Sequence, residues 1–176
     1  MFKKFSLCAL ALCTAINYSN AQQISASPSI ESSVVKPLVT PFEATYNVLH
    51  KSKSVGQGIR KLTYLDNGFA EYSYHTEIEW LIFSDKRGET SVVKLNGDKV
   101  IPTHYSYHRE GTGKDKAYEW TYDVANNKAV DIKRKRDKQI QFPDNIQDKL
   151  SYHFQHRLNL ILNPKQQHFV YPVVST

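Results

Sequence analysis

Hydrophobic and polar residues alternate along most of the chain after residue 41. In the clearest segment, residues 70–80, every second side chain apart from Thr76 is apolar or aromatic, and the side chains between them are polar. A period of two is typical of a strand that buries one face. The same pattern predicts strands over 42–48, 59–65, 89–95, 100–108, 118–124, 129–135 and 168–174. We therefore expect an all-β fold, either a curved antiparallel sheet or an open β-barrel.

Turn residues divide these strands. Asp66-Asn67-Gly68 and Asn96-Gly97 are strong hairpin signals, because Asn and Gly tolerate positive φ. Residues 81–83 follow the clearest strand without alternation, which predicts a segment buried on both sides, and residues 84–88 are expected to turn. Pro102 indicates a sheet edge or a bulge, because proline cannot donate to a ladder.

One helix is expected near the C-terminus. Apolar residues recur there at steps of three and four, from Ile146 to Ile161, as on one face of a helix. Asp144 or Asn145 is expected to cap its start, and Asn163-Pro164 to end it.

The N-terminus carries a different pattern. Two lysines precede a short apolar stretch, and small residues lead to Ala21, which is typical of a secretory signal peptide cleaved after that residue. We expect a signal peptide over 1–21, a disordered lead-in over 22–41, a single β-rich domain over 42–176 and a periplasmic location. Both cysteines lie within the signal peptide, so the mature chain has no disulfide and no thiolate ligand.

Charge adds little to this picture. The formal net charge is +6, and loss of Lys3 and Lys4 leaves +4. A mild basic excess suits contact with anionic surfaces, but simple solubility is the favoured explanation. Export argues against nucleic acid as the partner.

Three stretches resemble an exported bacterial family known as domain of unknown function 3108. They are the aromatic strand and glycines of 46–58, the segment 80–91, and Asp148-x-Leu150-Ser151 at the start of a helix that contains Arg157. Phe154 stands where many members have tyrosine. The resemblance implies a curved sheet or barrel with a helix, similar to periplasmic lipoprotein carriers and lipocalin-like folds. Family members continue with further strands, which implies that this chain is a truncated copy. The family implies no catalytic residues.

Aromatic side chains are the strongest functional signal. They repeat on strand faces, where they form either a packed core or the wall of a cavity for an apolar ligand. The candidate ligand-binding residues are Tyr72, Tyr74, Trp80, Tyr118, Trp120 and Tyr122, with Arg87 and Arg157 placed to orient a head group. Arg157 is equally explained by an ion pair with Asp148 or a sheet carboxylate.

A basic run follows the predicted strands. Its cations are Lys133, Arg134, Lys135 and Arg136. They form either a solvated hairpin tip or a patch for anionic lipid.

Glu77 and Glu79 share a strand face, as paired carboxylates of a hydrolase would, but the same face carries other polar residues. We expect no metal and no cofactor. The sequence favours a binding module for a lipid-like or amphipathic ligand, with a cell-envelope interaction protein as the alternative and a hydrolase third.

Overall fold

The computed structural model describes residues 38–174, so the expected signal peptide and most of the lead-in lie outside the described residues. Within this described part of the chain, eight strands precede one α-helix. The elements are β1 Phe42–His50, β2 Lys53–Tyr64, the 3-10 turn η1 Asp66–Gly68, β3 Phe69–Trp80, β4 Phe83–Asn96, β5 Lys99–Gly111, β6 Lys116–Asp123, β7 Lys128–Asp131, β8 Arg136–Gln139 and α1 Ser151–Leu162.

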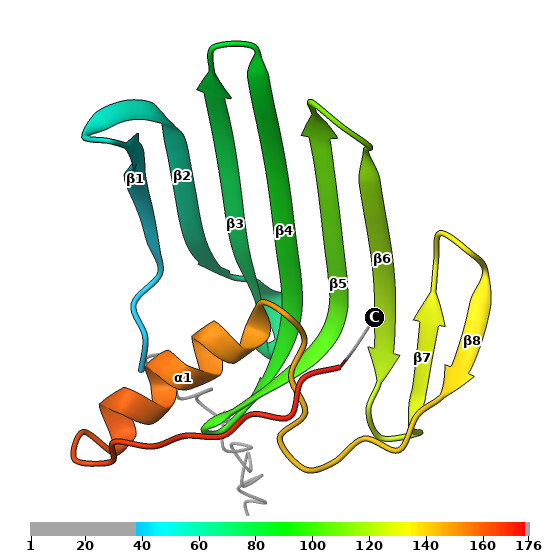
Figure 1. Cartoon of the computed structure of the whole chain (residues 1–176). Helices are drawn as coiled ribbons and strands as arrows, with labels where there is room; N and C mark the ends of the chain where they lie inside the picture. The colour runs from blue at the N-terminus through cyan, green and yellow to red at the C-terminus, as the bar shows by residue number, and fades with distance from the viewer. Residues whose placement is uncertain (1–37, 175–176) are drawn as a thin grey trace, which may run out of the picture. The chain divides into compact units, whose positions relative to one another are not determined.

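The strands form one antiparallel sheet in chain order. Each strand pairs with the next, from β1 to β8, and the described strands do not close into a barrel (Figure 1). The prediction of a curved all-β sheet with one C-terminal helix is confirmed. Chain-order pairing follows from the short turns, because antiparallel neighbours need only a few connecting residues.

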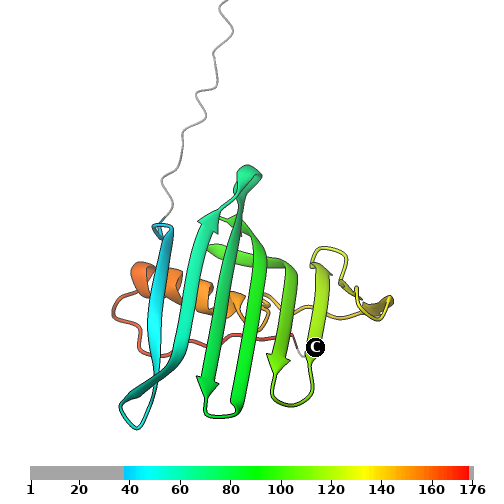
Figure 2. The ribbon, with the colours of Figure 1, turned by 90° about the horizontal axis from the view of Figure 1, so that it is seen from above.

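The helix α1 lies across one face of the sheet, which we call the helix face (Figures 1 and 2). Phe154 is buried against Tyr72, with ring centroids 6.0 Å apart, and against Tyr64 at 6.5 Å. Among residues 38–174, the buried core contains fifteen hydrophobic residues, including Leu62, Val93, Tyr105, Trp120 and Leu158. The core therefore sits between the helix and the sheet.

Two predictions about the middle of the chain are wrong. Residues 84–88 do not turn, because they lie within β4. Leu81 and Ile82 are not buried but form the β3–β4 hairpin turn, and they are 88% and 98% exposed. The loss of alternation at 81–83 marked a turn made of apolar residues rather than a doubly buried strand.

The C-terminal predictions also need correction. The helix begins at Ser151, so Asp144 and Asn145 do not cap it, and Ile146 precedes it as a buried residue of the connecting segment. The strand expected over 168–174 is reduced to one parallel bridge between Gln147 and Val173. The strand expected over 129–135 ends at Asp131, where a turn leads into β8.

Two smaller features of the fold, a turn and a bulge, agree with the predictions from the sequence. The Asp66-Asn67-Gly68 turn is present, with Asn67 at φ 58°. The register shifts between Val92 and Val93, because β5 has an extra residue, Thr103, directly after Pro102, and this is the bulge that Pro102 indicated. Packing begins before the predicted domain start, because Val39 is buried and its carbonyl accepts a hydrogen bond of 2.7 Å from the Tyr64 hydroxyl. Among the described residues, no helix has the length and apolar character needed to cross a membrane.

Candidate ligand-binding face

The strand register arranges the helix face in cross-strand rows. Residues directly opposite each other in an antiparallel pair point to the same side of the sheet. The buried row contains Leu62, Tyr72, Ser91, Tyr105 and Trp120, and the adjacent tyrosine row contains Arg60, Tyr74, Glu89, Tyr107 and Tyr118. The arginine row, one step further from the helix, contains Thr76, Arg87, Arg109 and Lys116.

Exposure rises across these rows. The five residues of the buried row are all buried, and every member of the tyrosine row is half-buried. In the arginine row, Arg87 and Lys116 are exposed while Thr76 and Arg109 are half-buried. One face of the sheet therefore changes from a closed aromatic core to an accessible cationic surface over two steps of the pleat.

Cations flank the rings of the tyrosine row. The Arg60 guanidinium lies 4.9 Å from the centroid of the Tyr74 ring, and the Lys149 ammonium lies 5.9 Å from that of Tyr118. Tyr107 and Tyr118 stack with centroids 5.6 Å apart. The buried Nε of Arg60 has no hydrogen-bond partner among residues 38–174. Positive charge over an aromatic face is attracted by the ring quadrupole, so these contacts orient both partners.

Glu89 is the only acidic member of the tyrosine row. Burial raises the pKa of its carboxyl above the ordinary value, while a hydrogen bond from the Tyr105 hydroxyl and the charge of Lys149 act in the opposite direction. A carboxyl that is partly removed from water takes up a proton more readily. Glu89 therefore binds a proton more tightly than an exposed glutamate does.

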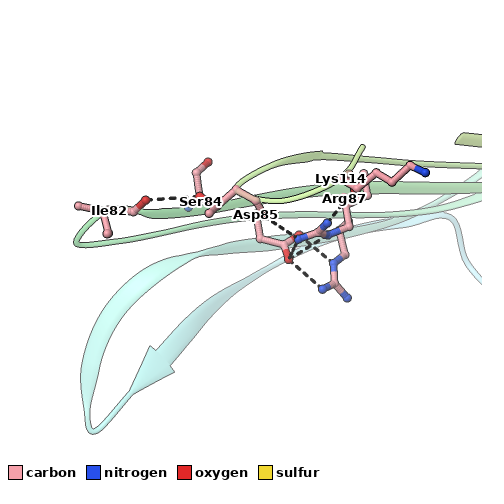
Figure 3. A network of polar contacts seen from close by, with 7 residues as sticks. Ile82, Ser84, Asp85, Arg87 and Lys114 are labelled. Carbon is pink, nitrogen blue, oxygen red and sulfur yellow. Dashed lines mark hydrogen bonds and ion pairs between the residues drawn. The ribbon is translucent and has the colours of Figure 1, made fainter. Parts of the chain in front are cut away.

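Asp85 organises the arginine row (Figure 3). Asp85 is 3% exposed, and its carboxylate accepts two bonds of 2.8 Å from Arg87, one to each oxygen. Arg109 donates to Oδ2 at 3.2 and 3.3 Å. The hydrogen bonds from Arg87, and then those from Arg109, lower the pKa of Asp85. Two guanidinium groups share one carboxylate, which leaves a net positive charge at this point.

The β5–β6 loop holds the second guanidinium in place. Arg109 donates to the carbonyl oxygens of Thr112 and Lys114, each at 3.1 Å. The Thr112 hydroxyl accepts a bond of 2.9 Å from the Ser84 amide. Gly111, at φ 122°, makes this approach possible, because a Cβ there would overlap the backbone of Ser84. Arg109 is therefore positioned by backbone, whereas the Arg87 side chain is 53% exposed.

The structure separates the aromatic candidates into three groups. Tyr72, Trp120 and Tyr122 are buried, and the Lys138 ammonium lies 5.0 Å from the centroid of Trp120. Tyr74 and Tyr118 belong to the tyrosine row. Trp80 lies apart from all of them at the far end of β3, where it contacts His50 with centroids 4.6 Å apart.

The two candidate arginines have different surroundings. Arg87 belongs to the Asp85 network. The Arg157 guanidinium lies 4.6 Å from the centroid of the Phe42 ring and has no ion pair with a described acid. The predicted pairing with Asp148 is wrong, because that carboxylate accepts from Ser91, Leu150 and Ser151 instead.

The basic run occupies the β7–β8 turn and the start of β8. Lys133 pairs with Glu119 at 3.3 Å, and Arg134 pairs with Asp131 at 3.3 Å. Lys135 and Arg136 have no ion pair with an acid within residues 38–174. Half of the run is thus occupied by contacts within the domain.

The face opposite α1 carries the predicted acidic pair. Glu77 and Glu79 both lie near the Lys86 ammonium, and the contact to Glu79 is 3.9 Å. A shallow hollow nearby contains His75, Glu77, Lys86 and His108, but not Glu79. Within the described part of the chain, no three histidine, cysteine or carboxylate side chains are grouped as metal ligands. Exposed ion pairs of this kind are common on sheet surfaces.

Sequence reasoning missed Arg60 and Arg109 as members of the site. Both lie in the same strand alternation as residues that it selected: Arg60 stands opposite Tyr74, and Arg109 opposite Arg87. The signal that could have found them is strand register, which becomes visible only after the turns are placed correctly.

Comparisons with known proteins do not name this fold's function. The chain matches no family model, no curated protein and no solved structure. Its resemblance to the exported bacterial family therefore rests on the three sequence stretches alone and stays a prediction.

Proposed function

We propose that the protein binds an amphipathic, lipid-like ligand on the helix face. The apolar part of the ligand lies along the tyrosine row, and its anionic head group contacts Arg87. The observation that carries this proposal is the gradation of the helix face from buried aromatic residues, through half-buried tyrosines, to an accessible guanidinium.

The side-chain chemistry of the tyrosine row and of the arginine row supports a ligand with an apolar part and an anionic head group. Tyrosine rings supply apolar contact area and keep a hydroxyl that can meet water or a polar group, so a half-buried tyrosine surface suits a ligand with both characters. A guanidinium presents a planar fork of donors that matches the oxygens of carboxylate or phosphate. Arg87 is fixed in orientation by Asp85 while half of its side chain stays accessible.

The expected location of the protein and its family resemblance are part of the same proposal. A periplasmic location, inferred from the predicted signal peptide, would expose the protein to lipids of the cell envelope. The resemblance to an exported family with carrier-like folds points in the same direction. A molecule in this compartment that combines an acyl chain with an anionic head would satisfy both rows.

Calorimetric titration with dodecyl phosphate, below its micelle concentration, tests the proposal. We expect Arg87→Gln to weaken binding roughly ten- to a hundredfold, because a charged hydrogen bond is lost. Arg109 still neutralises Asp85 in this variant, so the fold should persist. Tyr107→Ala should weaken binding of both dodecyl phosphate and dodecanol. Lys61→Gln is the matched control, because Lys61 lies on the opposite face and pairs with Glu43.

Equal affinity in the parent, Arg87→Gln and Tyr107→Ala proteins would overturn the proposal. Native mass spectrometry of protein purified from the periplasm gives an independent test. Added mass that extracts as lipid supports a carrier role.

The alternative, an envelope interaction protein, is favoured by one observation. β1 is a nine-residue edge strand whose outer side has no partner among residues 38–174. Edge strands of this length can accept a strand from another chain. By contrast, the other edge, β8, has only four residues, all of them exposed and three of them charged, which discourages pairing. A protein free of lipid that also fails to take up dodecyl phosphate would favour this alternative.

A further inference from the structure

The hairpin turns at one end of the sheet form an apolar tip. Because the strands run up and down in order, the β1–β2, β3–β4 and β5–β6 turns share one end, as Figures 1 and 2 both show. We call this the tip end. Its exposed hydrophobic residues are Leu49, Trp80, Leu81, Ile82 and Phe83. Contact between the His50 and Trp80 rings, at 4.6 Å, joins two of the hairpins.

The β3–β4 turn contradicts the usual chemistry of hairpins. Two-residue hairpin turns favour Asn-Gly or a glycine, because they require positive φ and face water. This chain has Leu81 at φ 55° and Ile82 beside it, and both are almost fully exposed. Leu81, at a strained φ, and the exposed Ile82 beside it stabilise neither the turn nor the core. Such local conflicts concentrate at functional sites.

Lysines surround this apolar tip. Lys51 and Lys53 lie at the β1–β2 turn, and Lys114 and Lys116 lie at the β5–β6 turn. None of the four has an ion pair with an acid in residues 38–174. The β7–β8 turn, with Lys135, points to the same end of the meander.

Acidic residues are also present near the tip end. Asp85 is held by two arginines, and Glu77 and Glu79 lie beside Lys86. Asp115 and Glu110 have no ion pair among the described residues. The unpaired lysines at the turns therefore outnumber the unpaired acids, and the surface around the apolar tip carries a net positive charge.

We propose that the tip end docks on an anionic phospholipid bilayer, with Leu81 and Ile82 inserted below the head groups and Trp80 at the interface. Apolar side chains ringed by lysine combine burial in the acyl region with attraction to anionic head groups. Trp80, next to the tip, has the amphipathic ring that favours the boundary between lipid and water. This inference is independent of the ligand on the helix face.

Trp80 provides a local reporter for the test. The chain has two tryptophans, and Trp120 is 2% exposed whereas Trp80 is 47% exposed. The full chain is mixed with phosphatidylcholine vesicles that contain 30% phosphatidylglycerol, and tryptophan emission is recorded. We expect a blue shift, quenching by lipids brominated on the acyl chain, and loss of both signals with zwitterionic vesicles. Added salt should weaken the binding.

The decisive variant replaces Leu81→Asn together with Ile82→Gly. These residues suit a hairpin turn, so the thermal midpoint should be unchanged or higher. We expect vesicle affinity to fall at least tenfold and bromolipid quenching to disappear. A second variant, Lys51→Gln with Lys114→Gln, should lower affinity and flatten the salt dependence. Its matched control is Lys94→Gln with Lys99→Gln, two exposed lysines near the β4–β5 turn at the opposite end of the sheet.

Three results would overturn the docking proposal. The first is no vesicle binding by the parent protein. The second is binding that the Leu81→Asn, Ile82→Gly protein retains in full. The third is a particular form of the first. The parent protein does not bind vesicles but sediments as a dimer, and the same substitutions dissociate that dimer, which would mean that the tip contacts a second copy of the chain.

Discussion

The Ser91 hydroxyl donates a hydrogen bond of 2.5 Å to Oδ2 of Asp148, and this contact joins the middle of β4 to the start of α1. The other oxygen of Asp148 accepts from the amides of Leu150 and Ser151 at 2.8 and 2.6 Å. In return, the Ser151 hydroxyl accepts from the Asp148 amide at 2.9 Å. The arrangement is of the capping-box kind. One buried carboxyl thus caps the helix and fixes it to the sheet.

Removing this carboxyl should destabilise the domain. In Asp148→Ala, two buried amides and the Ser91 hydroxyl lose their partner, so we expect the free energy of unfolding to fall by about 3 kcal/mol. Asp148→Asn keeps an oxygen for the amides and can donate to the Ser91 oxygen, so it should lose about 1 kcal/mol or less. Urea unfolding at pH 5 measures both values. Equal losses in the two variants would contradict the assigned hydrogen bonds.

The same residue should impose a pH dependence. Burial raises the pKa of Asp148 above its ordinary value of 3.8. The folded state therefore binds the proton more tightly than the unfolded state, and the stabilisation is complete below pH 3.8 and is lost as the pH rises through the folded pKa. We expect the stability of the parent, relative to Asp148→Asn, to fall as the pH is raised from 4. Parallel stability curves from pH 4 to 8 would contradict this expectation.

A strand glycine offers a packing test. A Cβ on Gly56 would overlap the backbone carbonyl oxygen of Glu77, whereas a Cβ on Gly58 would lie 3.5 Å from the side chains of Thr76 and Tyr74. Because backbone cannot move aside as a side chain can, Gly56→Ala should lower the free energy of unfolding by roughly 2 kcal/mol. Gly58→Ala should leave it unchanged or slightly higher. Denaturant titration of the two variants measures the difference. Similar stabilities would mean that β2 and β3 separate easily at this point.

The alternation of apolar and polar residues made the sheet predictable from the sequence. It did not predict the positions where apolar residues lie in a turn instead of in a buried strand. The period of two in residues 70–80 is a local property, and the strand there agrees with it. Leu81 and Ile82 have the composition of a buried strand and occupy a turn, because turn geometry is set by the pairing of β3 with β4 rather than by composition. The same pairing decides that 84–88 continue as strand.

The individual contacts that secure α1 to the sheet escaped prediction for a different reason. Polar contacts distant in sequence secure α1 and the segment before it. Gln155 accepts from the Val100 amide at 2.7 Å, and Gln147 donates to the Val100 carbonyl at 2.9 Å. A single sequence does not show which of its glutamines is buried. The candidate site was partly accessible, because alternation selected Tyr74, Tyr118 and Arg87, while the register that adds Arg60 and Arg109 required the correct turns.

Trp120 belongs to the packed core, and its substitution should reveal that. The sequence alone predicts that Trp120→Ala weakens ligand uptake, on the hypothesis that Trp120 lines a cavity. Its burial and its contact with Lys138 lead us to expect a loss of about 3–5 kcal/mol in the free energy of unfolding. Tyr118→Ala, in the half-buried tyrosine row, should lose less. Thermal unfolding followed by circular dichroism compares the two variants. If the Trp120→Ala protein is as stable as the parent, Trp120 does not belong to the packed core and lines an accessible cavity instead.

Asp85 should affect acid stability in the direction opposite to Asp148. Hydrogen bonds from Arg87 and Arg109 lower the pKa of Asp85 below its ordinary value of 3.8. The folded state therefore releases this proton more readily, so the stabilisation is complete above pH 3.8 and is lost as the pH falls through the folded pKa.

Asp85→Asn should lower the free energy of unfolding by about 1 kcal/mol at pH 7, a modest value because water screens the half-exposed Arg87. The difference should shrink toward zero as the pH approaches 2. The thermal midpoint between pH 2 and 7 measures this, with Asp98→Asn in the exposed β4–β5 turn as the matched control. A deficit that stays constant down to pH 2 would mean that Asp85 stabilises the arginine row through packing alone.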